Sequence, residues 1–354
     1  MTKRTFLIAG STAPIAKDPR YSHYSGPALI LAHQLRSMGH RVELVTGSWL
    51  KPEGWLASAT DIVLYHGLDM NGKLSINLYG GGTADNWKKL VNMAAYCSPL
   101  GTSLHSAFYQ TPNYAAYCKA RSWNPPPKRF SKGICILEAL SRSAMITNPN
   151  PSSHLILGDS HAPSVWVPGA HLKVISGLTL HGALEKGIHN LIDLKPNDPS
   201  PDSWRNYKRL TLYLGNIDIR HHLCRITTSH QIQVNMIAEM GTRLLAQLEH
   251  LRAITHVREI ELVEPLYIEP ETRVIPKTGW HKGRPFWGTW TERCFVRVAW
   301  AMELVKIQKK LGCELYLHPK AWQDDGTMRE EFLEKPRSVH VAPINYRAAK
   351  ELFT

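Results

Sequence analysis

The sequence predicts an α/β protein made of two doubly wound domains, each built on a parallel sheet. The chain of 354 residues is long for a single hydrophobic core and sufficient for two. In both halves, short apolar segments alternate with segments of helical periodicity, which is typical of parallel sheets flanked by helices. A stretch rich in proline, asparagine and serine, "TNPNPSSH" (147–154), separates the halves. We therefore expect domains over 1–150 and 151–354.

The first half begins with a strand, a helix and two further strands. "TFLIAG" starts at Thr5, and the apolar positions of the next segment recur at helical spacing until Gly39, which is suited to end a helix. "RVELVTG" from Arg41 and "DIVLYHG" from Asp61 are predicted strands. This order resembles the opening of nucleotide-sugar glycosyltransferases with two Rossmann-like domains. The resemblance implies a Rossmann-like first domain.

The second half offers five apolar segments and two long helices. The predicted helices run from about Gln231 to Leu251 and from about Thr291 to Leu311, where Gly312 would end the second one. The predicted strands lie in "HLILGDS", "LKVISGL", "RLTLYLGNID", "REIELVEPLYI" and "CELYLHP". This alternation predicts a second parallel sheet with helices on both faces.

Composition narrows the class of protein. The net charge of +13 favours a polyanionic partner such as DNA, and residues 1–152 carry +9 of it; a basic surface without a function is the alternative. No apolar run is long enough to span a bilayer, and the N-terminal apolar run is too short for a signal peptide, so we expect a cytoplasmic protein without membrane contact. The six cysteines form no C-x-x-C pair, and we predict neither a metal nor a cofactor.

Four motifs in the second half follow a recognisable order. They are Gly-Asp-Ser at 158–160, the glycines of "SGLTLHGAL", "LGNID" with Asn216 and Asp218, and a histidine, His340, near the C-terminus. Over most of residues 153–354 this order resembles SGNH, or GDSL-type, hydrolases. The resemblance implies an SGNH-like second domain with Ser160 as nucleophile. It also implies an oxyanion hole containing Gly177 or Gly182, with an approximate match at Asn216.

The chemistry of that family explains why these residue types would gather. A serine hydroxyl becomes a nucleophile when a histidine takes its proton, and amide N–H groups stabilise the resulting oxyanion. An aspartate normally orients the histidine, but Arg337 occupies its position here. A cation there would oppose imidazolium formation, so the sequence argues against ordinary ester hydrolysis.

Two basic stretches suggest a different reaction. Arg220, His221 and His222 follow a predicted strand, where they could bind phosphate; two adjacent histidines could instead bind a metal, although neighbours on a strand point apart. "KTGWHKGRPFWGTW" (277–290) interleaves rings with basic groups, as a flipped-base site does; sugar binding or plain packing are alternatives. The candidate nucleic-acid-binding residues are Trp280, His281, Lys282, Arg284 and Trp287, and the candidate substrate- or phosphate-binding residues are Asp159, His161, Gly182, Arg220, His221, His222 and Arg337.

Together these features predict a transferase that acts on DNA. Bacteriophage DNA-hypermodification systems contain enzymes of similar size, some of which join an amino acid such as glycine to an activated pyrimidine base. By that analogy Arg220, His221 and Arg337 would neutralise a leaving pyrophosphate and His340 would deprotonate the amine, while Ser160 and Asn216 would position the substrate. The alternatives are an SGNH-type esterase or O-acyltransferase acting on a carbohydrate, a DNA glycosyltransferase, and a nucleic-acid-binding protein without activity.

Overall fold

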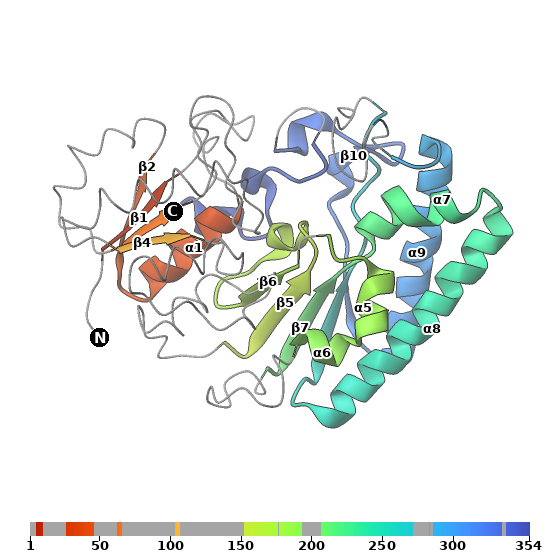
Figure 1. The fold of residues 1–354 in the computed structure, drawn as a ribbon, viewed down its shortest axis with the longest axis horizontal. Coiled ribbons are helices and arrows are strands. Elements are labelled where there is room, and N and C mark those ends of the chain that lie inside the picture. The colour runs from red at the N-terminus through yellow and green to blue at the C-terminus, as the bar shows by residue number, and fades with distance from the viewer. Residues whose placement is uncertain are drawn as a thin grey trace, which may run out of the picture.

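The protein contains two parallel sheets that lie on either side of helix α1 (Figure 1). The computed structural model describes residues 5–9, 26–45, 62–65, 103–106, 152–175, 177–192, 207–271, 283, 286–334 and 338–354. Within these ranges, both main sheets are parallel throughout, as the alternation of apolar and helical segments predicts. The predicted boundary near residue 151 lies outside the described ranges.

The larger sheet has five strands in the order β6-β5-β7-β8-β9. From β5 the chain first adds β6 on one side and then continues with β7 on the other side, so the strand order reverses between β5 and β7. Ligands of such sheets bind at the carboxyl ends of the strands on either side of this point. The strands are β5 (His154–Gly158), β6 (His171–Val174), β7 (Arg209–Tyr213), β8 (Glu259–Val263) and β9 (Glu314–Tyr316). All five coincide with predicted segments.

One face of this sheet is covered by four helices. They are α5 (Leu180–Lys186), α6 (Ile188–Ile192), α8 (His230–Ile254) and α9 (Trp290–Leu311). Leu155 and Leu157 of β5 pack into this core. The two long helices confirm the prediction, and Gly312 ends α9 in the left-handed conformation that favours glycine. A capping box between Thr289 and Glu292 begins α9.

The opposite face is covered partly by the first half of the chain. Ile156 points to this side and packs in a cluster that contains Leu29 and Ile30 of α1 (Gly26–Ser37). The short helices η3 (Ala162–Val165) and α10 (Ala349–Leu352) complete the layer. Gln34 Nε2 donates a hydrogen bond to the Ala170 carbonyl at 3.2 Å. Helix α1 therefore contributes to the core of the larger sheet.

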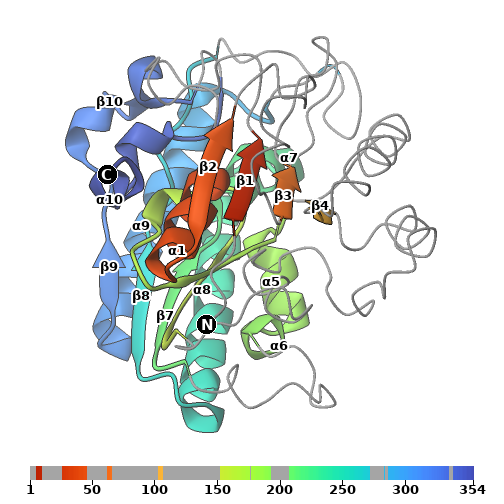
Figure 2. The ribbon, with the colours of Figure 1, turned by 90° about the vertical axis from the view of Figure 1, so that its left-hand side faces the viewer.

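The smaller sheet has the order β2-β1-β3-β4 and lies on the other side of α1 (Figure 2). Its strands are β1 (Thr5–Ala9), β2 (Arg41–Val45), β3 (Ile62–Tyr65) and β4 (Ser103–Ser106). The first three coincide with predicted strands, and β4 was not predicted.

Several short elements near the larger sheet were not predicted either. A π-helical turn, η5 (Asp218–Leu223), and helix α7 (Cys224–Ile226) follow β7. The last part of the chain contains η6 (Lys320–Trp322), a small hairpin of β10 (Gln323–Asp324) and β11 (Thr327–Met328), η7 (Glu330–Phe332) and η8 (Pro343–Asn345). No helix in the described part of the chain is long and apolar enough to cross a membrane.

Candidate active site

The candidate site begins where β5 and β7 approach each other at their carboxyl ends. Asp159 N–H donates to the Tyr213 carbonyl at 3.3 Å, which extends the pairing by one residue. A Cβ on Gly158 would lie 2.4 Å from the same carbonyl oxygen, so the position requires glycine. Directly after Asp159 the chain leaves the sheet and turns into η3. This turn places Ser160 at the strand end, as the Gly-Asp-Ser motif indicates.

Ser160 and His340, which are far apart in the sequence, lie in contact. His340 Nε2 is 2.9 Å from Ser160 Oγ, a distance suited to proton transfer. The other ring nitrogen of His340, Nδ1, is 3.3 Å from Glu334 Oε1. The side chains of His340 and Glu334 are 32% and 19% exposed, so substrate can reach the pair. Hydroxyl, imidazole and carboxylate are thus arranged in series.

A narrow hairpin brings the carboxylate and the imidazole together. Leu333 and Val341 form an antiparallel bridge, and Glu334 N–H donates to the His340 carbonyl at 2.9 Å. Ser338 Oγ donates to Glu334 Oε1 at 3.0 Å and accepts from His340 N–H at 3.2 Å. The carboxylate partner of His340 therefore comes from the segment that is bridged to it.

This arrangement corrects the expectation drawn from Arg337, which itself lies outside the described residues. In the family pattern, the acid lies three residues before the histidine in the sequence, which here is position 337. Glu334 instead pairs with His340 across a hairpin, so that His340 does have a carboxylate partner. Sequence reasoning missed Glu334. A signal was present in the sequence: Pro336, which favours a turn, lies between Glu334 and His340 and could have indicated that the two residues face each other.

Asn216 follows β7 and offers a buried amide near the same sheet edge. Its Oδ1 accepts a hydrogen bond from Leu266 N–H at 2.9 Å, which fixes the orientation of the amide and leaves Nδ2 as the donor. Nδ2 is buried, and among the described residues no acceptor of ordinary geometry reaches it. It interacts with the hydroxyl of Tyr213, whose pKa is raised by burial. An amide N–H of this kind can stabilise an oxyanion.

Gly215 determines where Asn216 can lie. Its φ of +105° is a conformation that other residues rarely adopt, and a Cβ would lie 2.8 Å from Trp300 Nε1. The backbone therefore passes close to α9 immediately before the amide.

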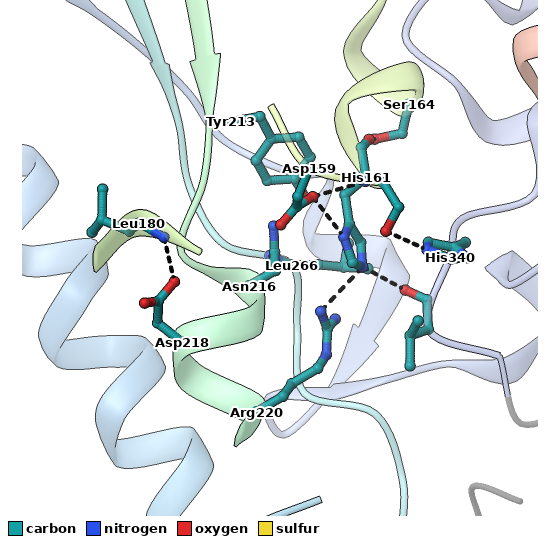
Figure 3. A network of polar contacts seen from close by, with 12 residues as sticks. Asp159, His161, Ser164, Leu180, Tyr213, Asn216, Asp218, Arg220, Leu266 and His340 are labelled. Carbon is teal, nitrogen blue, oxygen red and sulfur yellow. Dashed lines mark hydrogen bonds and ion pairs between the residues drawn. The ribbon is translucent and has the colours of Figure 1, made fainter. Parts of the chain in front are cut away.

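A chain of buried polar side chains lies beside His340 (Figure 3). His161 Nδ1 is 2.9 Å from Asp159 Oδ1, and Arg220 Nη1 is 3.1 Å from His161 Nε2. Arg220 also forms an ion pair with Glu269. All four side chains are almost fully buried.

The electrostatics of this chain favour a neutral imidazole beside an ionised carboxylate. Burial lowers the pKa of His161, and the charge of Arg220 lowers it further, although Asp159 acts in the opposite direction. Burial pushes the pKa of Asp159 up, but contacts with His161 and the charge of Arg220 outweigh burial and hold it below its usual value. Asp159 and His161, which were predicted to bind substrate or phosphate, thus bond to each other inside the protein, and neither is placed as an open ligand.

Two predicted site residues lie elsewhere. Asp218 accepts hydrogen bonds from Leu180 N–H at 2.6 Å and His181 N–H at 3.2 Å, and in Figure 3 it points away from His340. It therefore anchors the start of α5, and the structure does not bring the predicted catalytic Asp218 together with Ser160 and His340. Gly182 N–H donates to Thr179 Oγ1 at 2.8 Å in the first turn of α5. This N–H already donates a hydrogen bond within the helix, so it is not free to stabilise an oxyanion.

The predicted phosphate-binding residues after β7 make contacts within the protein. Arg220 is neutralised by Glu269, and the buried ring of His221 stacks on Phe286 with centroids 6.3 Å apart. His222 is half-buried in the same π-helical turn. Arg220 and His221 thus support the fold around the site, and neither is placed as an open anion ligand.

The described end of the aromatic and basic loop packs against the protein. Arg293 lies over the ring of Phe286 at 4.3 Å, and Trp287 packs on the main core with Arg225 at 5.9 Å from its ring. Trp280, His281, Lys282 and Arg284 lie outside the described residues. In the described part of the chain, no group of three or more histidine, cysteine or acidic side chains is placed to hold a metal ion.

Comparison with known proteins gives only distant likenesses. No family model matches the sequence, and no curated protein matches it. A structure described as a platelet activating factor from Streptococcus pneumonia is 14% identical, with a TM-score of 0.38, over 61% of this chain and 88% of that one. A phospholipase A1 from Streptomyces albidoflavus NA297 is 14% identical (TM-score 0.29, 56% and 95%), and an extracellular lipase from Streptomyces rimosus is 11% identical (TM-score 0.29, 56% and 97%). Likenesses this distant assign no activity to the chain.

Proposed function

We propose that the chain is an acyl hydrolase or acyltransferase of SGNH type in which Ser160 attacks the carbonyl carbon of an ester. The observation that carries this proposal is the series of contacts from Ser160 Oγ to His340 Nε2 and from His340 Nδ1 to Glu334. Hydroxyl, imidazole and carboxylate in this order form the constellation used for nucleophilic acyl transfer on several unrelated folds. The strand order of the larger sheet, with Ser160 after its first strand, agrees with an SGNH-like domain.

Each residue has a definite task in this reaction. His340 Nε2 takes the proton of Ser160 as the Oγ–carbon bond forms, and Glu334 stabilises the resulting imidazolium. Asn216 Nδ2 is buried, so it would donate to the oxyanion of the tetrahedral intermediate only once bound substrate displaces the atoms that cover it. The intermediate collapses as His340 returns the proton to the leaving alkoxide. Water or another alcohol then attacks the acyl-serine with His340 as base, which frees Ser160.

The DNA transferase remains a prediction with weaker support. It depends on Arg220 and His221 as ligands for a leaving pyrophosphate, whereas Arg220 is paired with Glu269 and His221 is stacked on Phe286. Arg337, the third proposed ligand, lies outside the described residues. The contacts of His340 favour acyl transfer because a carboxylate partner is what a general base for serine requires.

The experiment that tests the proposal is hydrolysis of p-nitrophenyl esters with acyl chains from two to twelve carbons. We expect turnover by the wild type and at least about a thousandfold loss in Ser160→Ala and His340→Ala. Ser153→Ala is the matched control because Ser153 is exposed at the opposite end of β5. Turnover that survives in Ser160→Ala contradicts the proposal. Formation of a new nucleoside from amino acid and modified DNA, without ester turnover, would favour the transferase.

A further inference from the structure

A second histidine lies beside the Ser160–His340 pair and has no task in the proposed reaction. His161 follows Ser160 in the chain, and its ring lies 4.8 Å from the ring of His340, centroid to centroid, at an angle of 54°. Its side chain is only 3% exposed, so substrate cannot reach it. Any effect of His161 on catalysis must therefore pass through its neighbours.

The ring of His161 is held on both sides by charged groups. Asp159 Oδ1 accepts from His161 N–H at 2.8 Å and lies 2.9 Å from Nδ1 of the ring. At the other end, Arg220 Nη1 is 3.1 Å from Nε2, and Glu269 holds Arg220 by an ion pair. A side chain fixed at both ends by buried charged partners has little rotational freedom.

The distal end of His161 contacts the segment that carries the general base. Nε2 lies 3.0 Å from the carbonyl oxygen of Val339, the residue before His340. The neutral ring, which burial favours, carries its proton on Nδ1 and accepts from Arg220 at Nε2, so Nε2 packs against the Val339 oxygen without donating to it. Only a protonated ring would donate to this oxygen from Nε2. One fixed ring therefore contacts both the backbone and the side chain of the base segment while it is covalently linked to the nucleophile.

We propose that His161 is a positioning residue that holds His340 Nε2 within hydrogen-bond distance of Ser160 Oγ. The buried chain of Asp159, Arg220 and Glu269 fixes His161, and His161 in turn fixes the Val339–His340 segment. Because the Glu334–His340 pair is partly exposed on its hairpin, it needs support from the protein interior. The inference rests on the proposed acyl-transfer function. It adds a residue to the site whose removal affects the chemical step more than substrate binding.

Two substitutions in the full-length protein separate positioning from folding. Glutamine can place an amide donor and acceptor near the position of Nε2, where Val339 and Arg220 lie, whereas asparagine reaches only toward Asp159. We expect His161→Asn to lower kcat for the ester about 10- to 100-fold with KM within about twofold, since a displacement of about 1 Å costs up to 10²-fold. His161→Gln should recover most of this loss.

His171→Asn is the matched control. His171 is half-buried at the amino end of β6, away from Ser160, and its Nδ1 bonds to the Tyr207 hydroxyl at 2.8 Å. We expect this variant to lose thermal stability and to keep its kcat. An unchanged kcat in His161→Asn would overturn the inference. It would also be overturned if both the Asn and the Gln variant lost the same share of kcat and this loss matched their lowered melting temperatures.

A second readout does not depend on turnover. The proton and nitrogen resonances of the His340 ring, observed by NMR with labelled histidine, report its contacts with Ser160 and Glu334. They should shift in His161→Asn and return toward wild type in His161→Gln. If the wild type hydrolyses no ester, the proposed function fails while these resonances still test the positioning contact. Resonances unmoved by both substitutions would overturn it.

Discussion

In the proposed reaction, Glu334 stabilises the positive charge that forms on His340, and Glu334→Gln removes this effect while it conserves size. The carboxylate oxygen lies 3.3 Å from His340 Nδ1. At this separation, two unit charges attract by about 5 kcal/mol at an effective dielectric of about 20 and by about 1 kcal/mol in bulk water. Because the side chains are 32% and 19% exposed, we take an intermediate value of about 3 kcal/mol. At 1.36 kcal/mol per factor of ten, kcat should fall roughly 100-fold.

The assay is steady-state hydrolysis of a p-nitrophenyl ester at neutral pH. Glu331→Gln is the control, because Glu331 lies on the same segment but pairs with Arg329 on the surface, so its kcat should stay within about twofold of the wild type. Thermal unfolding of both variants excludes a folding defect. If Glu334→Gln keeps a kcat within twofold of the wild type while Ser160→Ala has none, the assigned role of Glu334 is wrong.

Three further predictions concern stability. Burial raises the pKa of Asp218 to about 6 from an ordinary 3.8, so the folded protein binds this proton more tightly than the unfolded chain. The stability gained from this proton is present below about pH 4 and is lost as pH rises through about 6. Urea unfolding should therefore show the stability advantage of wild type over Asp218→Asn shrinking by about 3 kcal/mol between pH 4 and 7, and a constant difference would contradict this. Gly158→Ala should lower the free energy of unfolding by at least about 2 kcal/mol, because its Cβ would meet the Tyr213 carbonyl, and an unchanged melting temperature would exclude that clash. Ile30→Ala should lower the free energy of unfolding by about 2–4 kcal/mol, because Ile30 is 2% exposed in the core that contains Trp166. Tryptophan fluorescence follows this unfolding, and an unchanged free energy would show that α1 does not cover the larger sheet.

The strands and long helices were predictable because their signals are local. The segments of β5 and β7 are short, apolar runs that end at glycine, and Gly312 marks the end of α9. The turn elements after β7 were not predicted because the π-helical turn has no distinct periodicity in sequence. Packing of α1 onto the larger sheet was also not predictable, since the same apolar positions would suit a helix on its own sheet.

The placement of candidate site residues was predictable where it follows from the end of a strand. Ser160 and Asn216 belong to this class, as does the pairing of Ser160 with His340 that the family resemblance implies. The ion pair of Arg220 was not predicted because the sequence does not reveal that Glu269 lies beside it. Glu334 was missed because a contact across a hairpin leaves no fixed spacing in the chain.

The most direct test of the central claim is to treat the full-length protein with a fluorophosphonate and to locate the adduct by peptide mass spectrometry. The contacts of Ser160 with His340 and Glu334 predict one adduct, on Ser160, that is absent in Ser160→Ala and forms more slowly in Glu334→Gln. A wild-type protein that remains unlabelled, or carries the label on another serine, would contradict the assignment of Ser160 as an activated nucleophile.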